Sequence, residues 1–144
     1  MPSRIKAYFH PSRNATPVAA VGPAFDAAKN HPHELYQGLP FAQTPFIERI
    51  ETIEVQLSSI AGGATKLTMR MSRDAAGDEV VIPDVEGTIA TGITTATKGA
   101  VVYTAQIPID AGAGAGSTFY LHFKTDALGS SATVDSSTIT WVES

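Results

Sequence analysis

The chain has 144 residues, a net charge of −4 and no cysteine. This length suits one domain with a buried core plus an appendage. The lack of cysteine excludes disulfides, a thiol nucleophile and cysteine-ligated metal sites.

The first residues lead into no apolar run like that of a signal peptide, and no segment approaches the ~20 apolar residues that cross a bilayer. Residues 1–46 carry four basic and two acidic side chains, whereas residues 47–144 carry six basic and twelve acidic ones. Phosphate neutralisation needs a clustered basic face, which this distribution does not supply. We therefore expect neither a nucleic acid nor a membrane as a partner.

Residues 1–46 are predicted to form an extended, proline-rich arm. Each proline removes a backbone donor and biases its predecessor toward extended geometry, so neither a long helix nor a paired central strand forms at this density. The segment is nevertheless rich in large apolar residues, which disordered linkers lack. The arm must therefore pack either along its own sandwich or along a neighbouring subunit. Seven of the nine prolines lie here: Pro2, Pro11, Pro17, Pro23, Pro32, Pro40 and Pro45.

The large apolar side chains of this arm are the candidates for partner contacts. A short run, residues 25–29, could also form a helical turn. The predicted partner-binding residues are Tyr8, Phe9, Phe25, Leu35, Tyr36, Phe41 and Phe46.

Residues 47–144 are predicted to form the folded domain, and they begin with two long strands. The first, residues 47–60, changes parity at Ile50, which predicts a bulge near Glu51. The second, residues 65–73, alternates regularly between apolar and polar residues. The turn residues 61–64 between them predict a hairpin. The expected inward-facing residues are Ile53, Val55 and Leu57 in the first strand and Leu67, Met69 and Met71 in the second.

Shorter strands follow. Residues 80–82 are predicted to form a strand that Pro83 closes. The strand at 100–109 carries Pro108, which cannot donate to a ladder, so this end should lie at an edge or a bulge. Residues 131–134 and 137–143 are predicted as two closing strands. The expected inward-facing residues are Val101, Tyr103, Ala105, Ile107 and Ile109, followed by Ile139 and Trp141.

The stretch 117–125 is predicted to be a central strand. Its inward positions hold two phenylalanines and a leucine, which give the largest burial per residue in this sequence. Its outward positions hold Tyr120, His122 and Lys124, and we expect His122 to be exposed or to face another subunit. Strands at intervals of about ten residues, with no helix-period segment, predict an all-β antiparallel sandwich or jelly roll.

Histidines offer one candidate metal site. His31 and His33 could share a zinc ion, but they need further ligands, and no cysteine supplies one. We therefore expect a solvated, proline-rich loop here, and no cofactor or metal. His10 precedes Pro11 and does not complete a set of metal ligands.

The acidic residues between 74 and 86 offer a second candidate, because calcium takes six or more oxygens. Gly77 stands fourth from Asp74 rather than sixth, so the spacing matches no EF-hand loop. A plain acidic loop is the preferred interpretation. The acidic residues are Asp74, Asp78, Glu79, Asp84 and Glu86.

No motif predicts an enzyme. The sequence contains no Gly-x-Ser-x-Gly elbow and no glycine-rich phosphate loop followed by lysine. Aromatic residues could instead form a platform for a sugar, although Tyr103 and Trp141 fall on inward parity and only Tyr120 clearly falls outward. The residues considered are Tyr36, Phe41, Tyr103, Tyr120 and Trp141.

Residues 63–74, the threonine-rich middle and residues 137–143 resemble small β-sandwich structural proteins of tailed-bacteriophage virions. The resemblance lies in small residues, threonine and the absence of cysteine, over about two thirds of the chain. It implies a capsid decoration (cement) protein, made in the host cytoplasm, that sits on the capsid surface as an oligomer, often a trimer. Its partners would be the major capsid protein and copies of itself. The alternative is a carbohydrate-binding or receptor-binding module of similar fold, with a glycan as ligand.

Overall fold

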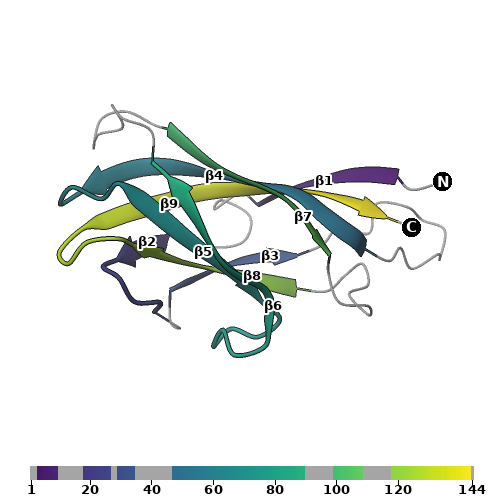
Figure 1. Cartoon of the computed structure of the whole chain (residues 1–144), viewed down its shortest axis with the longest axis horizontal. Coiled ribbons are helices and arrows are strands. Elements are labelled where there is room, and N and C mark those ends of the chain that lie inside the picture. The colour runs from purple at the N-terminus through teal and green to yellow at the C-terminus, as the bar shows by residue number, and fades with distance from the viewer. Residues whose placement is uncertain are drawn as a thin grey trace.

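The computed structural model describes residues 3–9, 18–26, 29–34, 47–89, 99–108 and 118–143. These residues form nine strands in two antiparallel sheets that lie face to face (Figure 1). The predicted all-β antiparallel sandwich is therefore confirmed. The strands are β1 (Ser3–Phe9), β2 (Val18–Val21), β3 (Asn30–Glu34), β4 (Ile47–Ala61), β5 (Lys66–Ser72), β6 (Val80–Thr88), β7 (Gly99–Pro108), β8 (Thr118–Thr125) and β9 (Ser131–Glu143).

The two sheets differ in size. Sheet A has the order β1-β9-β4-β7, and β2 also pairs with β9. Sheet B has the order β3-β8-β5-β6. Within the described ranges, no helix is long and apolar enough to span a membrane.

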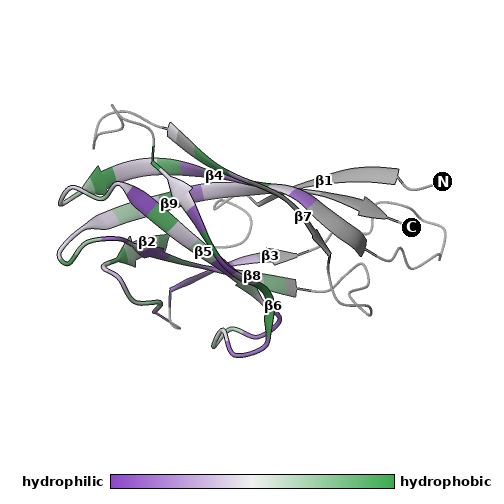
Figure 2. Ribbon diagram, viewed as in Figure 1, coloured by the Kyte–Doolittle hydropathy of each residue, from purple (hydrophilic) through white to green (hydrophobic). Residues whose placement is uncertain are grey.

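Core residues come from strand faces that alternate with period two. Along β4 and β5 the hydrophobic and hydrophilic residues alternate visibly (Figure 2). Each fully buried aliphatic or aromatic side chain contributes about 1.5–3 kcal/mol of transfer free energy. The predicted inward residues that prove to be buried are Ile53, Val55, Leu57, Leu67, Met69, Met71, Val101, Tyr103, Phe119, Leu121, Phe123 and Ile139.

The prediction that β4 and β5 form a hairpin is wrong. The two strands lie in different sheets, since β4 pairs with β7 and β9 whereas β5 pairs with β6 and β8. The turn at Gly62 and Gly63, both with positive φ, carries the chain from one layer to the other. The buried residues of both strands thereby belong to one core between the sheets.

Irregularities in the ladders were partly predicted. Both pairings of β4 shift register between Ile50 and Thr52, so the bulge expected near Glu51 is confirmed. β7 is an edge strand of sheet A, as Pro108 indicated. The prediction that Pro83 closes the strand is wrong. β6 continues past Pro83 to Thr88, because an edge strand with a shifted register tolerates proline.

The closing strand is also longer than predicted. β9 is one continuous strand rather than two pieces. Gln56 is opposite Ser136 and Leu57 is opposite Val134, so the strand absorbs Asp135 as an extra residue. A register shift of this kind keeps alternate side chains on the core face on both sides of the irregularity.

The described parts of the arm lie along the sandwich of the same chain. β1 and β2 pair with β9, and β3 pairs with β8 at the edge of sheet B. Pro32 lies in this edge strand, where a missing N–H is tolerated. Lys29 N–H donates to the Asp26 carbonyl at 3.0 Å, so a turn closes there. Residues 10–17, 27–28 and 35–46 lie outside the described residues.

Candidate functional site

A group of polar and aromatic side chains lies on the outer face of sheet B. β5 contributes Arg70 and Ser72, and β8 contributes His122 and Lys124, at positions that alternate with the core residues. The backbone register places Arg70 opposite His122. Asp84 joins them from β6, where it contacts both cations. This is the outer-face cluster.

His122 is buried, with 1 % of its surface exposed, so the expectation that it would be exposed is wrong. Two connections cover it from outside the sheet. Gly77 in the β5–β6 loop lies so close that a Cβ there would stand 3.3 Å from the imidazole. Phe25, from the β2–β3 connection, meets the ring edge-on with centroids 6.5 Å apart. An outward strand position can therefore be interior when loops fold over it.

Ser72 and His122 form a buried pair that resembles the serine and histidine of a nucleophilic active site. Ser72 Oγ lies 2.7 Å from His122 Nε2 and donates its proton to the Asp74 carbonyl at 2.6 Å. When this hydroxyl donates to the carbonyl, the matching His122 tautomer carries its proton on Nε2. A general base must accept the serine proton, whereas in this hydrogen-bond pattern the proton goes to a backbone carbonyl.

Burial and the neighbouring charges shift the protonation equilibrium of His122. Burial lowers the pKa of the His122 imidazole, and the charge of Arg70 lowers the pKa further. The carbonyl and the carboxylate of Asp74 act in the opposite direction. The neutral imidazole is therefore favoured in the folded protein.

Asp74 closes the β5–β6 loop rather than orienting His122. Its carboxylate accepts the N–H of Glu79 at 2.8 Å and that of Asp78 at 3.2 Å. These hydrogen bonds, led by that of Glu79, lower the pKa of Asp74. A catalytic triad needs the carboxylate on the imidazole, whereas this one binds its own loop.

Phe25, one of the predicted partner contacts, packs on its own chain. The Arg70 guanidinium lies 4.4 Å and the Lys124 ammonium 4.8 Å from the centre of its ring. Asp84 bonds Arg70 Nε at 2.8 Å and lies 3.8 Å from Lys124 Nζ, so one carboxylate serves both cations. Asn30 Nδ2 donates to the Ala75 carbonyl at 3.2 Å, which ties the start of β3 to the β5–β6 loop.

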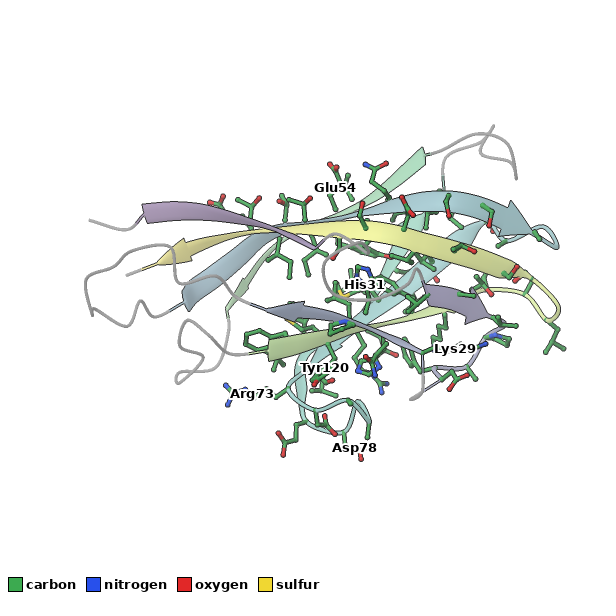
Figure 3. The ribbon with its side chains drawn as sticks, turned by 180° about the vertical axis from the view of Figure 1, so that it is seen from behind. Lys29, His31, Glu54, Arg73, Asp78 and Tyr120 are labelled. Atoms are coloured by element: carbon green, nitrogen blue, oxygen red, sulfur yellow. The ribbon has the colours of Figure 1, made fainter. Side chains whose placement is uncertain are left out.

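His31 is buried between the sheets, so the expected solvated loop is wrong here (Figure 3). Its Nδ1 lies 3.1 Å from Ser137 Oγ, and its ring contacts Phe123 at 6.4 Å between centroids. The side chain of His33 lies outside the described residues. Among the described residues, no three histidine, aspartate or glutamate side chains gather to hold a metal ion.

Three of the five acidic residues considered for calcium contact protein groups through their carboxylates. Glu86 Oε1 accepts from Lys66 Nζ at 2.8 Å, and this hydrogen bond raises the pKa of Lys66. Asp84 and Asp74 have the contacts given above, while Asp78 and Glu79 are exposed on the loop. Asp84 and Glu86 lie in β6, so the five acidic residues do not share one loop.

Other predicted site residues are only partly described. β1 contains Tyr8 and Phe9, paired with Thr138 and Ser137, and nothing further is described of their side chains. Leu35, Tyr36, Phe41 and Phe46 lie outside the described residues, as does the side chain of Trp141.

The two described tyrosines of the proposed sugar platform differ in environment. Tyr103 belongs to the core and donates its hydroxyl to the Leu67 carbonyl at 2.7 Å. Burial raises the pKa of Tyr103. Tyr120 is half-buried and points outward from sheet B (Figure 3).

The sequence matches no protein-family model, and no curated protein matches it. Among solved structures, a CocE/NonD family hydrolase from Staphylococcus aureus is similar, with a TM-score of 0.43 and 11 % identity. The match covers 98 % of this chain and 37 % of that one, so the chain spans little more than a third of the hydrolase. A likeness at this level carries no argument about activity.

Proposed function

We propose that the chain is a non-enzymatic structural protein of a tailed-bacteriophage virion, a capsid decoration protein that binds the major capsid protein and reinforces the shell. The observation that supports the non-enzymatic part is the state of Ser72 in the outer-face cluster. Its hydroxyl donates to the Asp74 carbonyl in the loop, and its oxygen lies 2.7 Å from Nε2 of the buried His122. The pair fixes a loop to a sheet, which is a structural task.

The polar contacts of the cluster support the same proposal. Asp84 neutralises Arg70 and approaches Lys124, and both cations face Phe25. Cation–π contacts contribute about 0.5–1 kcal/mol each at exposed sites. Together they hold the β2–β3 connection on sheet B, so the cluster stabilises a rigid body.

The virion setting comes from the resemblance of residues 63–74 and 137–143 to small virion β-sandwich proteins. A rigid sandwich that presents a broad surface suits the task of bridging capsid subunits, because many modest contacts spread over an interface add up to firm binding. The net charge of −4 on the whole chain also favours the solubility of free copies before assembly.

The test uses the intact chain, because the described parts of the arm form edge strands of the sandwich. Capsids of the encoding phage, lacking the protein, are mixed with increasing amounts of it and sedimented. The proposal predicts saturable binding at a fixed ratio to the major capsid protein. Absence of the chain from the pellet at about 10 μM, a concentration where micromolar affinity would be evident, contradicts the proposal.

A further inference from the structure

The edge of sheet A at β7 differs from the other sheet edges. β7 has ten residues and pairs along one side with β4. Within the described ranges, no strand pairs with its other side. An edge strand presents backbone N–H and C=O groups that another strand can satisfy.

The other edges carry features that block pairing. β6 contains Pro83, two register shifts against β5, and the charged residues Asp84 and Glu86. β2 has only four residues, and β3 has five and contains Pro32. The sequence of β1 includes Arg4 and Lys6. Short length, proline, irregular register and charge all discourage edge-to-edge association.

From Gly99 to Thr104, β7 has none of these features, whereas its pairing with β4 shifts register between Thr104 and Ile107. No residue from Gly99 to Pro108 is charged, and its only proline is the last residue. Val102 faces outward with 47 % of its surface exposed, while Val101 and Tyr103 are anchored in the core. The buried neighbours fix the face that the strand presents, so the edge is held in one register.

We propose that β7 is a self-association edge, which pairs antiparallel with β7 of a second copy about a two-fold axis. Such an isologous pair joins two copies of sheet A into one continuous sheet. When β7 pairs with β7 of a second copy, no like charges lie opposite each other, because the strand is uncharged. A charged strand would place like charges close together. We therefore assign a second copy of the chain as the partner of this edge.

The expected affinity is modest. A single pair of ten-residue strands buries less than the ~1,600 Å² of a standard stable interface. The association should therefore depend on concentration in the micromolar range. The inference deepens the proposed function, because it names the surface through which copies contact each other, and it rests on that proposal only for its biological setting.

The test compares two valine substitutions on two edges. Val102→Lys places a charge in the middle of β7, and Val80→Lys places the same charge on β6, at a valine with nearly equal exposure of 46 %. Mass is measured by light scattering and sedimentation across a concentration series, without capsids present. Thermal unfolding of both variants verifies that they fold.

The wild type should approach twice its 15.1 kDa mass as concentration rises. Val80→Lys should follow the same curve, whereas Val102→Lys should remain monomeric. A wild type that is monomeric up to about 100 μM, or a Val102→Lys variant that associates like Val80→Lys, overturns the inference. Because capsids are absent from this test, a negative result contradicts the β7 pairing without affecting the result of the capsid-binding test.

A second measurement avoids any dependence on how lysine affects folding. The chain has no cysteine, so Val102→Cys offers a single site for a nitroxide spin label. At about 3.4 Å per residue, pairing that overlaps most of β7 places the two labels within about 3 nm. A defined intermolecular distance in that range supports the pairing, and its absence from an associated sample contradicts it.

Discussion

His122 illustrates how a single residue can have opposite interpretations in sequence and structure. Alternation places it on the outer face of β8, and that face was correctly predicted. Its burial was not, because Gly77 and Phe25 come from connections that alternation in one strand does not describe. Gly77 has a φ of +85°, and a side chain there would press on the imidazole. The sequence signal for the burial of His122 was therefore a glycine in an acidic loop.

The same residue predicts a pH dependence of stability. The folded pKa of His122 lies below that of the unfolded chain, near 6.5. The unfolded state therefore binds the extra proton more readily, so stability is greatest above about pH 6.5 and falls as the pH drops toward the folded pKa. The contribution of Asp74, whose pKa is also lowered, is lost only in more acidic solution, below about pH 4.

His122→Phe should separate this effect from all others. The variant keeps a ring against Phe25 but cannot bond to Ser72, so it should lose about 1–3 kcal/mol at pH 7.5. It should also lose the slope between pH 7 and 5 that the wild type shows. Urea unfolding at a series of pH values measures both. Equal slopes in the two proteins would mean that another group is responsible.

At the scale of elements, the connection between β4 and β5 depends on the turn between β8 and β9. Asp126 in that turn accepts the N–H groups of Thr65 at 3.0 Å and Lys66 at 3.2 Å, and also the Thr65 hydroxyl. These bonds, led by those of Thr65, lower the pKa of Asp126 to about 2. The β4–β5 connection and the β8–β9 turn, which are distant in sequence, therefore stabilise each other.

Two neighbouring glycines in this connection provide a matched test. A Cβ on Gly62 would lie 2.5 Å from the Gly129 carbonyl oxygen, whereas one on Gly63 would meet nothing within 4 Å. Both have positive φ, so each alanine should cost about 1 kcal/mol from the backbone. Gly62→Ala should lose roughly 1–3 kcal/mol more, because the clash is with backbone that cannot move away easily.

Denaturant unfolding of the two alanine variants measures this difference. Gly63→Ala serves as the control for backbone strain alone. If the two variants are equally stable, then the β4–β5 connection does not pack on the β8–β9 turn as described.

The strands of the folded domain were largely predictable, whereas the strands β1, β2 and β3 of the arm and the pairing of the strands were not. The faces of β4, β5 and β8 follow from period two, and the bulge near Glu51 follows from one residue of wrong parity. The hairpin prediction failed because two amphipathic strands around a glycine pair have the same local pattern whether they share a sheet or face each other. The choice depends on β7 and β9, which occupy both sides of β4.

The candidate site was less predictable than the fold. Phe25 was selected for its apolar side chain, and the sequence could not show that Arg70 and Lys124 would contact it. His31 was placed in a solvated loop because it adjoins Pro32, yet an edge strand accepts that proline and directs the imidazole into the core. In both cases the decisive contacts are long-range.

At the scale of the whole molecule, the sandwich has two unlike sides. On one side, β1, β2 and β3 extend the sheets through β9 and β8. On the other side, β6 and β7 lie close together, where Gly87 lets β6 approach Val101 and Tyr103. Of the described edge strands, β7 is thus the long uncharged one, as the proposed pairing between copies requires.

The alternative of a receptor-binding or carbohydrate-binding module predicts attachment without reinforcement. A head fibre could bind the capsid at a fixed ratio and leave the strength of the shell unchanged. Binding alone therefore does not separate the two hypotheses, whereas shell stability does.

The most direct measurement is the temperature at which capsids of the encoding phage disrupt, with and without saturating amounts of the intact chain. Ligands that bind only the assembled state raise its stability by mass action. The account predicts a clear rise in the disruption temperature that saturates with occupancy. An unchanged temperature on fully occupied capsids would contradict it.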